Sequence, residues 1–119
     1  MKIRFLLDEN LSKQIKFAVL RLNPSVDILG VGEPNAPDFG TLDPEILIYV
    51  ETSQRLLITD NRKSMPEHLE AHWAVGRTIW GLFWVRPQTS IGKLADNIYL
   101  FWETSEAEEW INVVDWIPF

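Results

Sequence analysis

Residues 3–22 read IRFLLDENLSKQIKFAVLRL, and within them the spacing of apolar residues changes from that of a buried strand to that of a helix. Residues 3–7 are apolar except for Arg4, which is typical of a short buried β-strand, and they end at the polar residues 8–10. From position 11 apolar residues recur at helical spacing, which predicts an amphipathic helix that stops near Asn23-Pro24. The segment is therefore predicted to be a strand–helix unit with a polar junction.

The same alternation continues along the chain. Further strands are predicted at residues 26–31, 56–59 and 78–85, and the Pro- and Gly-rich residues 32–42 predict a long loop. Two helices are expected to begin at Asp43, as a cap, and at Ser90. Two more are expected to begin at capping boxes, Ser64/Glu67 and Ser105/Glu108. Strands this apolar, alternating with helices, predict an α/β fold with a mainly parallel central sheet and helices on both faces.

Length and composition indicate one globular unit. At 119 residues, with 46% hydrophobic and 24% charged residues, we expect a single domain over residues 1–119. Cysteine is absent, which excludes disulfides and thiolate metal sites. The N-terminus lacks the apolar stretch of a signal peptide, and no apolar run approaches the roughly 20 residues of a membrane span, so we expect a cytoplasmic protein without membrane segments.

The net charge of −6 argues against a protein that coats duplex DNA non-specifically, because such binding relies on Lys and Arg. The charge is uneven, however. Five basic residues fall within the first 21 positions, whereas the residues after Lys93 are acidic or neutral. Local basic patches are therefore still compatible with the sequence.

Acidic residues follow three of the predicted strands. Asp8 and Glu9 follow the first, Asp43 opens the helix after the second, and Asp60 follows the third. Because the carboxyl ends of parallel strands meet at one edge of a sheet, these side chains are expected to converge. Clustered carboxylates repel one another unless a cation such as Mg²⁺ or Mn²⁺ neutralises them. Taken singly, each acid is explained equally well as a helix cap or a turn residue.

Three stretches of the sequence resemble the short bacterial PIN-like family: FLLDENLS at 5–12, LDPEILIYV at 42–50 and RLLITDNRKSMPEHL at 55–69. The family pattern is a strand ending in Asp-x-Asn, a helix start of the form D-x-x-[IVL]-L, and a strand ending in Thr-x-Asp. The similarity extends over essentially the whole chain. It implies a three-layer PIN-like fold, a divalent metal ion at clustered acids, and cleavage of RNA, often as the toxin of a toxin–antitoxin pair.

Carried over to this sequence, the first acid of the family falls on Asp8 and the second on Asp43, with Glu45 as the close alternative. The chain departs from the pattern at the third, where Asn61 stands in the Asp position and Asp60 precedes it. The resemblance thus implies Asp8, Asp43 and Asp60 as catalytic residues and metal ligands, with Asn61 as a further ligand. The expected substrate-binding residues are Asn10, Thr59, Arg62 and Lys63.

Two functions follow from this site. In the first, the protein is a Mg- or Mn-dependent ribonuclease in which the metal activates water for attack on an RNA phosphodiester. In the second, Asn61 has removed the metal site, and the protein is a catalytically degenerate PIN-like module that binds protein or nucleic acid. Fold resemblance alone does not choose between them.

The remaining signals are weaker. His68 and His72 have the spacing of paired zinc ligands, but the segment HLEAH lacks the Glu directly after the first His that the metalloprotease motif requires. Trp80 and Trp84 are expected on one face of the fourth strand, in the core or at an interface rather than stacked on bases. The apolar tail residues Trp110, Trp116, Ile117 and Phe119 are expected either at an interface with an antitoxin or a second copy, or docked on their own chain.

Overall fold

The computed structural model describes residues 1–118 and contains one sheet of five parallel strands. The strands are β1 (Arg4–Leu7), β2 (Asp27–Gly30), β3 (Arg55–Thr59), β4 (Leu82–Val85) and β5 (Val114–Ile117), in the spatial order β2-β1-β3-β4-β5. The helices are α1 (Gln14–Leu22), α2 (Asp43–Ser53), α3 (Met65–Ala74) and α4 (Ile91–Thr104), with a short 3₁₀ helix, η1 (Ala107–Trp110). The predicted α/β class and parallel sheet are confirmed.

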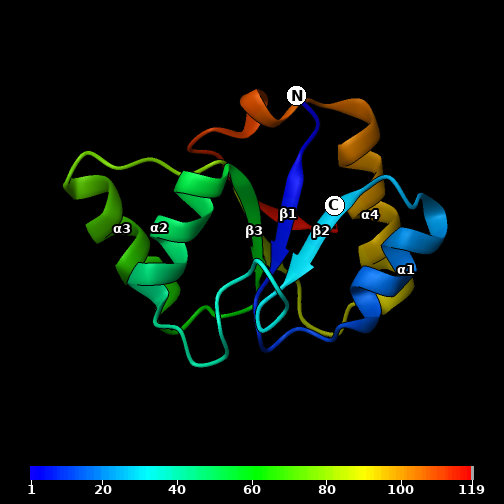
Figure 1. The fold of residues 1–119 in the computed structure, drawn as a ribbon, viewed down its shortest axis with the longest axis horizontal. Coiled ribbons are helices and arrows are strands. Elements are labelled where there is room, and N and C mark those ends of the chain that lie inside the picture. The colour runs from blue at the N-terminus through cyan, green and yellow to red at the C-terminus, as the bar shows by residue number, and fades with distance from the viewer. Residues whose placement is uncertain (119) are drawn as a thin grey trace.

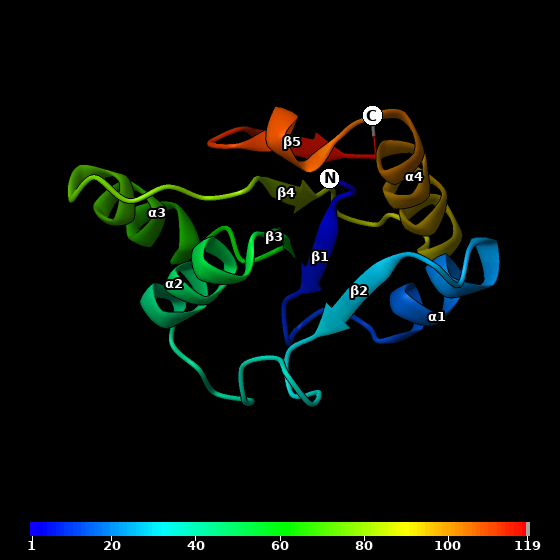
Figure 2. The same cartoon turned by 45° about the horizontal axis from the view of Figure 1, so that its top comes forward.

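The two faces of the sheet belong to different hydrophobic cores. Alternate strand residues, such as Phe5 and Ile58, share a core with α1 and α4, whereas their neighbours Leu6 and Leu57 share a core with α2 and α3. Figure 1 shows the corresponding arrangement, with α2 and α3 on the left of the strands and α1 and α4 on the right. Figure 2 shows β4 and β5 continuing the sheet beyond β3.

The strand predicted at residues 78–85 is shorter, since β4 begins only at Leu82. Gly81 interrupts it: its φ is +109°, and a Cβ atom there would lie 2.9 Å from Leu56 Cδ1. The prediction that Trp80 and Trp84 share a strand face is therefore wrong. Trp80 packs against the core of α1 and α4, and Trp84 lies in the core of α2 and α3.

Three predicted helix starts differ from the structure. Leu42, not Asp43, is the N-cap of α2. Ser64 is the N-cap of α3 but makes no side-chain hydrogen bond to the helix; its hydroxyl donates to Asp43 and accepts from the Asn61 side chain. The second capping box is formed by Glu106 and Glu109 around η1, while Ser105 donates to the Phe101 carbonyl oxygen. The Ser90 cap of α4 is confirmed, with its hydroxyl accepting from the Lys93 amide.

The apolar tail forms β5, which pairs in parallel with β4 and was not predicted as a strand. Ile117 is fully buried, Trp110 packs against the core of α1 and α4, and Trp116 packs against the core of α2 and α3. The tail therefore docks on its own chain and offers a second chain less apolar surface than the sequence suggested. Phe119 lies outside the described residues.

The strands present their carboxyl ends along one edge, at the bottom of Figure 1, where the loop of residues 31–42 also lies. Residues that follow different strands meet there, which is what positions the candidate site. Within residues 1–118, every helix is too short or too polar to cross a bilayer.

Candidate functional site at the carboxyl edge of the sheet

Asp8 is the first residue beyond β1 and is only 8% exposed. Its backbone amide donates to the Ile58 carbonyl oxygen at 3.0 Å, so the strand pairing continues into the site and fixes the position of Asp8. Its carboxylate accepts from the Thr59 hydroxyl at 2.6 Å and from the Glu9 amide at 2.8 Å. Asp8 is thus held rigidly at the end of two central strands.

Thr59 links Asp8 to the loop after β3. Its side chain is completely buried, and its Oγ1 accepts from the Asn61 amide at 3.0 Å while donating to Asp8. Thr59 was expected to bind substrate, and in this structure its side chain is enclosed by the protein and contacts Asp8. Thr59 is a positioning residue for Asp8.

Asn61 and Ser64 connect this pair to Asp43, in the first turn of α2. Asn61 Nδ2 donates to Asp43 Oδ2 at 3.2 Å, and Ser64 Oγ donates to the same oxygen at 2.6 Å. Asn61 also donates to Ser64 Oγ at 2.9 Å. A continuous chain of hydrogen bonds therefore runs from Asp8 through Thr59, Asn61 and Ser64 to Asp43.

Asp60 faces a different hollow. It is exposed and lines a cavity of about 490 Å³ together with Asn10, Arg62 and Arg86, whereas Asp43 and Asn61 line a neighbouring cavity of about 380 Å³. Asn61, and not Asp60, therefore contacts Asp43. The backbone turn after Thr59 sends the two neighbouring side chains to opposite sides.

The electrostatics of Asp8 follow from this arrangement. Burial raises the pKa of the Asp8 carboxyl above its ordinary value, and the negative charges of Asp43 and Asp60 add to the rise, while the hydrogen bonds from Thr59 and Glu9 act against it. In the described part of the chain neither Asp8 nor Asp43 forms an ion pair with a basic side chain. Asp8, Asp43 and Asp60 therefore lie at this edge without an ion pair to any basic side chain of residues 1–118.

The donor chemistry suits a hard divalent cation. Asp8 and Asp43 offer carboxylate oxygens, whereas Asn61 turns its amide nitrogen toward Asp43 and its amide oxygen accepts from the Ser64 backbone amide. Over residues 1–118, no three side chains of the Asp, Glu and His types lie together in a way that could hold a metal ion. A cation bound here would therefore depend on two carboxylates, water and the phosphate of a substrate, a ligand set typical of Mg²⁺ sites.

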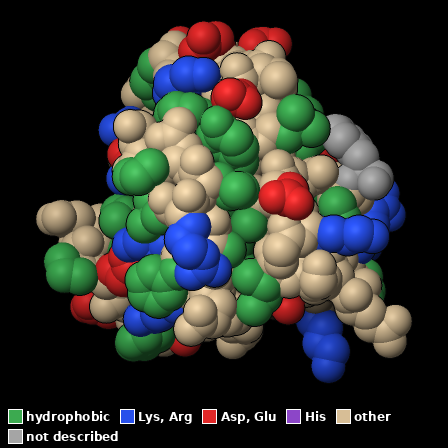
Figure 3. Space-filling view, turned by 90° about the vertical axis from the view of Figure 1, so that its right-hand side faces the viewer, with side chains coloured by type: hydrophobic (Ala, Val, Ile, Leu, Met, Phe, Trp, Pro, Cys, Tyr) green, Lys and Arg blue, Asp and Glu red, His purple; other side chains and the backbone are tan. Residues whose placement is uncertain are grey.

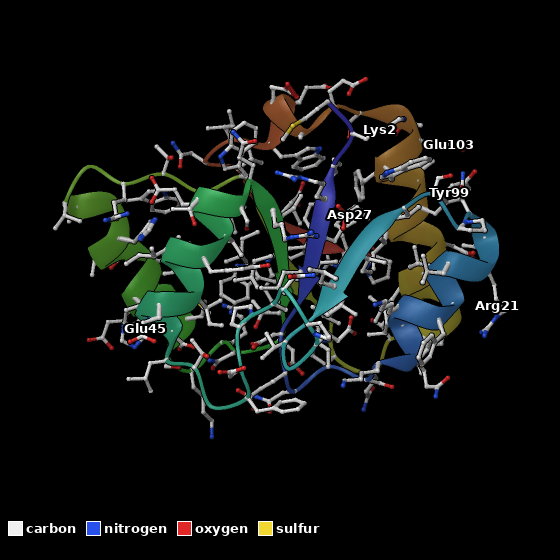
Figure 4. The ribbon with its side chains drawn as sticks, viewed as in Figure 1. Lys2, Arg21, Asp27, Glu45, Tyr99 and Glu103 are labelled. Atoms are coloured by element: carbon white, nitrogen blue, oxygen red, sulfur yellow. The ribbon has the colours of Figure 1, made fainter. Side chains whose placement is uncertain are left out.

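The other predicted residues are distributed around the edge. Glu9 accepts from the Gly40 amide at 3.0 Å and so tethers the loop of residues 31–42. Asn10 lines the larger cavity, and Lys63 is exposed. Glu45, the alternative to Asp43, is exposed, and Figure 4 shows it pointing away from the strands.

The two histidines line a common cavity of about 200 Å³ together with Ile48 of α2 and Ala71 of α3. His72 is buried, with Nε2 lying 2.8 Å from the Thr78 carbonyl oxygen and 3.3 Å from Glu51 Oε1. His68 also lines the cavity of about 380 Å³ beside Asp43. Over residues 1–118 no third acidic or histidine side chain joins the two histidines in a group that could hold a metal ion, so the zinc hypothesis gains no support.

Three residues at this edge were not identified from the sequence. Ser64 was assigned to a capping box, Arg86 was not considered, and Trp116 was assigned to the tail. Arg86 directly follows β4 just as Asp60 directly follows β3, so a search for polar residues at strand ends, which found Asp60, also finds Arg86.

Comparison of the chain with protein-family models, curated proteins and solved structures found no match.

Proposed function

We propose that this chain is a PIN-like, Mg- or Mn-dependent endoribonuclease. The observation that carries the proposal is Asp8, a buried carboxylate that is hydrogen-bonded through a chain to Asp43 and has no basic partner among residues 1–118. A buried acid without a counter-charge requires either a proton or a cation. The resemblance to PIN-like proteins makes a divalent cation the simpler choice.

The residues have separate roles in the proposed reaction. Asp8 and Asp43 would hold the cation, which supplies an activated water and stabilises charge that develops on the phosphate. Thr59 and Ser64 orient the two carboxylates through hydrogen bonds of 2.6 Å each. Arg62, at the neighbouring cavity, steadies the RNA phosphate. Water adds to phosphorus, the bond to the leaving ribose oxygen breaks, and that oxygen takes a proton.

A second function rests on Asn61. Its side-chain amide donates to Asp43 Oδ2 and so satisfies a carboxylate oxygen that a metal ion would otherwise bind. With this contact and no third acid, the same fold would serve as a non-catalytic module that binds RNA or protein. The two functions differ in whether the wild-type protein binds a divalent cation.

Calorimetric titration of Mn²⁺ into the wild type, Asp8→Asn and Asp96→Asn tests the proposal. Asp96 is an exposed residue of α4, so Asp96→Asn makes the same chemical change outside the site. We expect Asp8→Asn to lower metal affinity by at least about tenfold and Asp96→Asn to leave it unchanged. On a mixed pool of single-stranded RNA, only the wild type and Asp96→Asn should cleave. A wild type that neither binds Mn²⁺ nor cuts RNA would favour the binding module.

A further inference from the structure

The larger cavity beside Asp60 has the construction of a ligand pocket. Its volume of about 490 Å³ lies within the range of small-molecule sites. Its floor includes the buried side chains Ile15 and Leu94, with Ile91 beside them, whereas polar residues form the rim. An apolar floor beneath a polar rim suits a ligand with one flat apolar part and one charged part.

Two arginines on the rim are held by tryptophan rings. The guanidinium of Arg62 lies 4.4 Å from the ring centroid of Trp116 and 5.2 Å from that of Trp84. The guanidinium of Arg86 lies 5.5 Å from the same Trp116 ring, and its Nε donates to the Pro118 carbonyl oxygen at 2.7 Å. These contacts restrict both side chains before any ligand binds, which lowers the entropy lost on binding.

Within residues 1–118 the two guanidinium groups have no anionic partner. Neither Arg62 nor Arg86 forms an ion pair with any residue from 1 to 118, although Asp60 lines the same cavity. Among the described residues that line the cavity, two are positively charged and one is negatively charged. Because guanidinium groups bind phosphate oxygens through paired hydrogen bonds, a phosphate is the anion that this geometry fits.

The N-terminus of α4 adds to the positive potential. This helix has 14 residues and begins after Ser90, and Thr89 and Ile91 on either side of that cap line the cavity. The first turn contains no acidic residue that would offset the helix dipole. Free backbone amides and the dipole at such an end favour an anion close to the two arginines.

We propose that this pocket binds a nucleoside phosphate, with the phosphate on Arg62 and Arg86 and the base over the apolar floor. The unit is either one nucleotide of an RNA strand or a free mononucleotide. For an RNA strand the inference rests on the proposed function, and it gives the substrate a defined contact next to Asp8. Binding at the pocket itself does not require a metal ion.

Calorimetry in EDTA with uridine 5′-monophosphate, uridine, inorganic phosphate and a short single-stranded RNA tests this proposal. We expect the nucleotide to bind more tightly than uridine or phosphate alone. Arg62→Gln should weaken nucleotide binding by about tenfold, the loss expected when a charged hydrogen bond is removed. The matched control is Arg21→Gln, because Arg21 is exposed and Figure 4 shows it projecting from the far end of α1. It should bind as the wild type does.

A second variant examines the floor without removing charge. Ile91→Ala should weaken binding of the nucleotide but not of inorganic phosphate. RNA that binds more tightly than the nucleotide identifies a strand as the ligand, and equal binding identifies a free nucleotide. The proposal is overturned if uridine binds as well as its phosphate, or if Arg62→Gln and Arg21→Gln behave alike. Nucleotide binding by a wild type that never cleaves RNA would support the pocket and reject the nuclease.

Discussion

At the scale of single residues, Asp8 shows how burial and function are connected. The fold places this carboxyl between two central strands, where burial raises its pKa and two neighbouring acids reinforce the rise. Its hydrogen bonds from Thr59 and Glu9 only partly offset these effects. A charged Asp8 therefore destabilises the folded state unless a cation is bound, and this gives a pH dependence that can be measured.

The change to test is Asp8→Asn, in EDTA. The pKa of an Asp side chain in an unfolded chain is about 3.9, and the pKa of Asp8 in the folded protein is raised above its ordinary value. Between these two pKa values the folded protein holds more protons than the unfolded chain, so Asp8 lowers the free energy of unfolding as pH rises. Denaturant unfolding from about pH 3 to about pH 7 should show the variant gaining stability relative to the wild type across this window. If the difference in free energy of unfolding between wild type and variant does not change with pH, the pKa of Asp8 is not raised in the folded protein.

Asn61→Asp tests the position at which the PIN-like pattern has its third acidic residue. The wild-type amide donates to Asp43, whereas the variant would place a carboxylate against a carboxylate. In EDTA we expect a loss of about 1–3 kcal/mol in the free energy of unfolding, and Mn²⁺ should restore it because a third acid strengthens cation binding.

Gln14→Glu, at the exposed start of α1, makes the same amide-to-acid change as a control. Its stability should not depend on Mn²⁺. If Mn²⁺ does not raise the melting temperature of Asn61→Asp, no cation binds between these residues, and the non-catalytic module gains support.

At the scale of elements, the sequence predicted those strands and helices that the local spacing of apolar residues indicates. Residues 3–7 and 56–59 are continuous apolar runs, and the helical spacing after position 11 is plain, so β1, β3 and α1 were expected near their observed places. The acids at the strand ends followed from topology alone. β5 was missed because residues 114–117 form a short segment whose strand conformation depends on the free edge of β4.

The errors at the site have a tertiary origin. A Ser followed three residues later by Glu predicts a capping box, but Ser64 instead donates to Asp43, which lies 21 residues away in sequence. Likewise, no local pattern says which of Asp60 and Asn61 faces Asp43. In the turn after β3, the backbone amide of Asn61 donates to Thr59 Oγ1. In this turn the side chain of Asn61 faces Asp43, and that of Asp60 does not.

At the scale of the whole molecule, charge limits how RNA can be held. The chain has a net charge of −6, so attraction to RNA must be local. Figure 3 shows the face formed by α1 and α4, where basic, acidic and hydrophobic side chains are interspersed rather than gathered in one basic stripe. The Arg62 and Arg86 pair supplies the cationic side chains that line the cavity beside Asp60.

This restriction predicts a shallow salt dependence of RNA binding. For single strands, the logarithm of the binding constant falls with the logarithm of salt concentration by about 0.7 per phosphate neutralised. Two arginines therefore predict a slope of about −1.4, and Arg62→Gln should reduce it to about −0.7. Fluorescence anisotropy of a short labelled RNA in EDTA, between about 50 and 200 mM salt, measures both slopes, with Arg21→Gln expected to match the wild type. A wild-type slope steeper than about −3 would mean that basic residues outside the pocket, such as those of α1, dominate binding, because two contacts cannot release that many counterions.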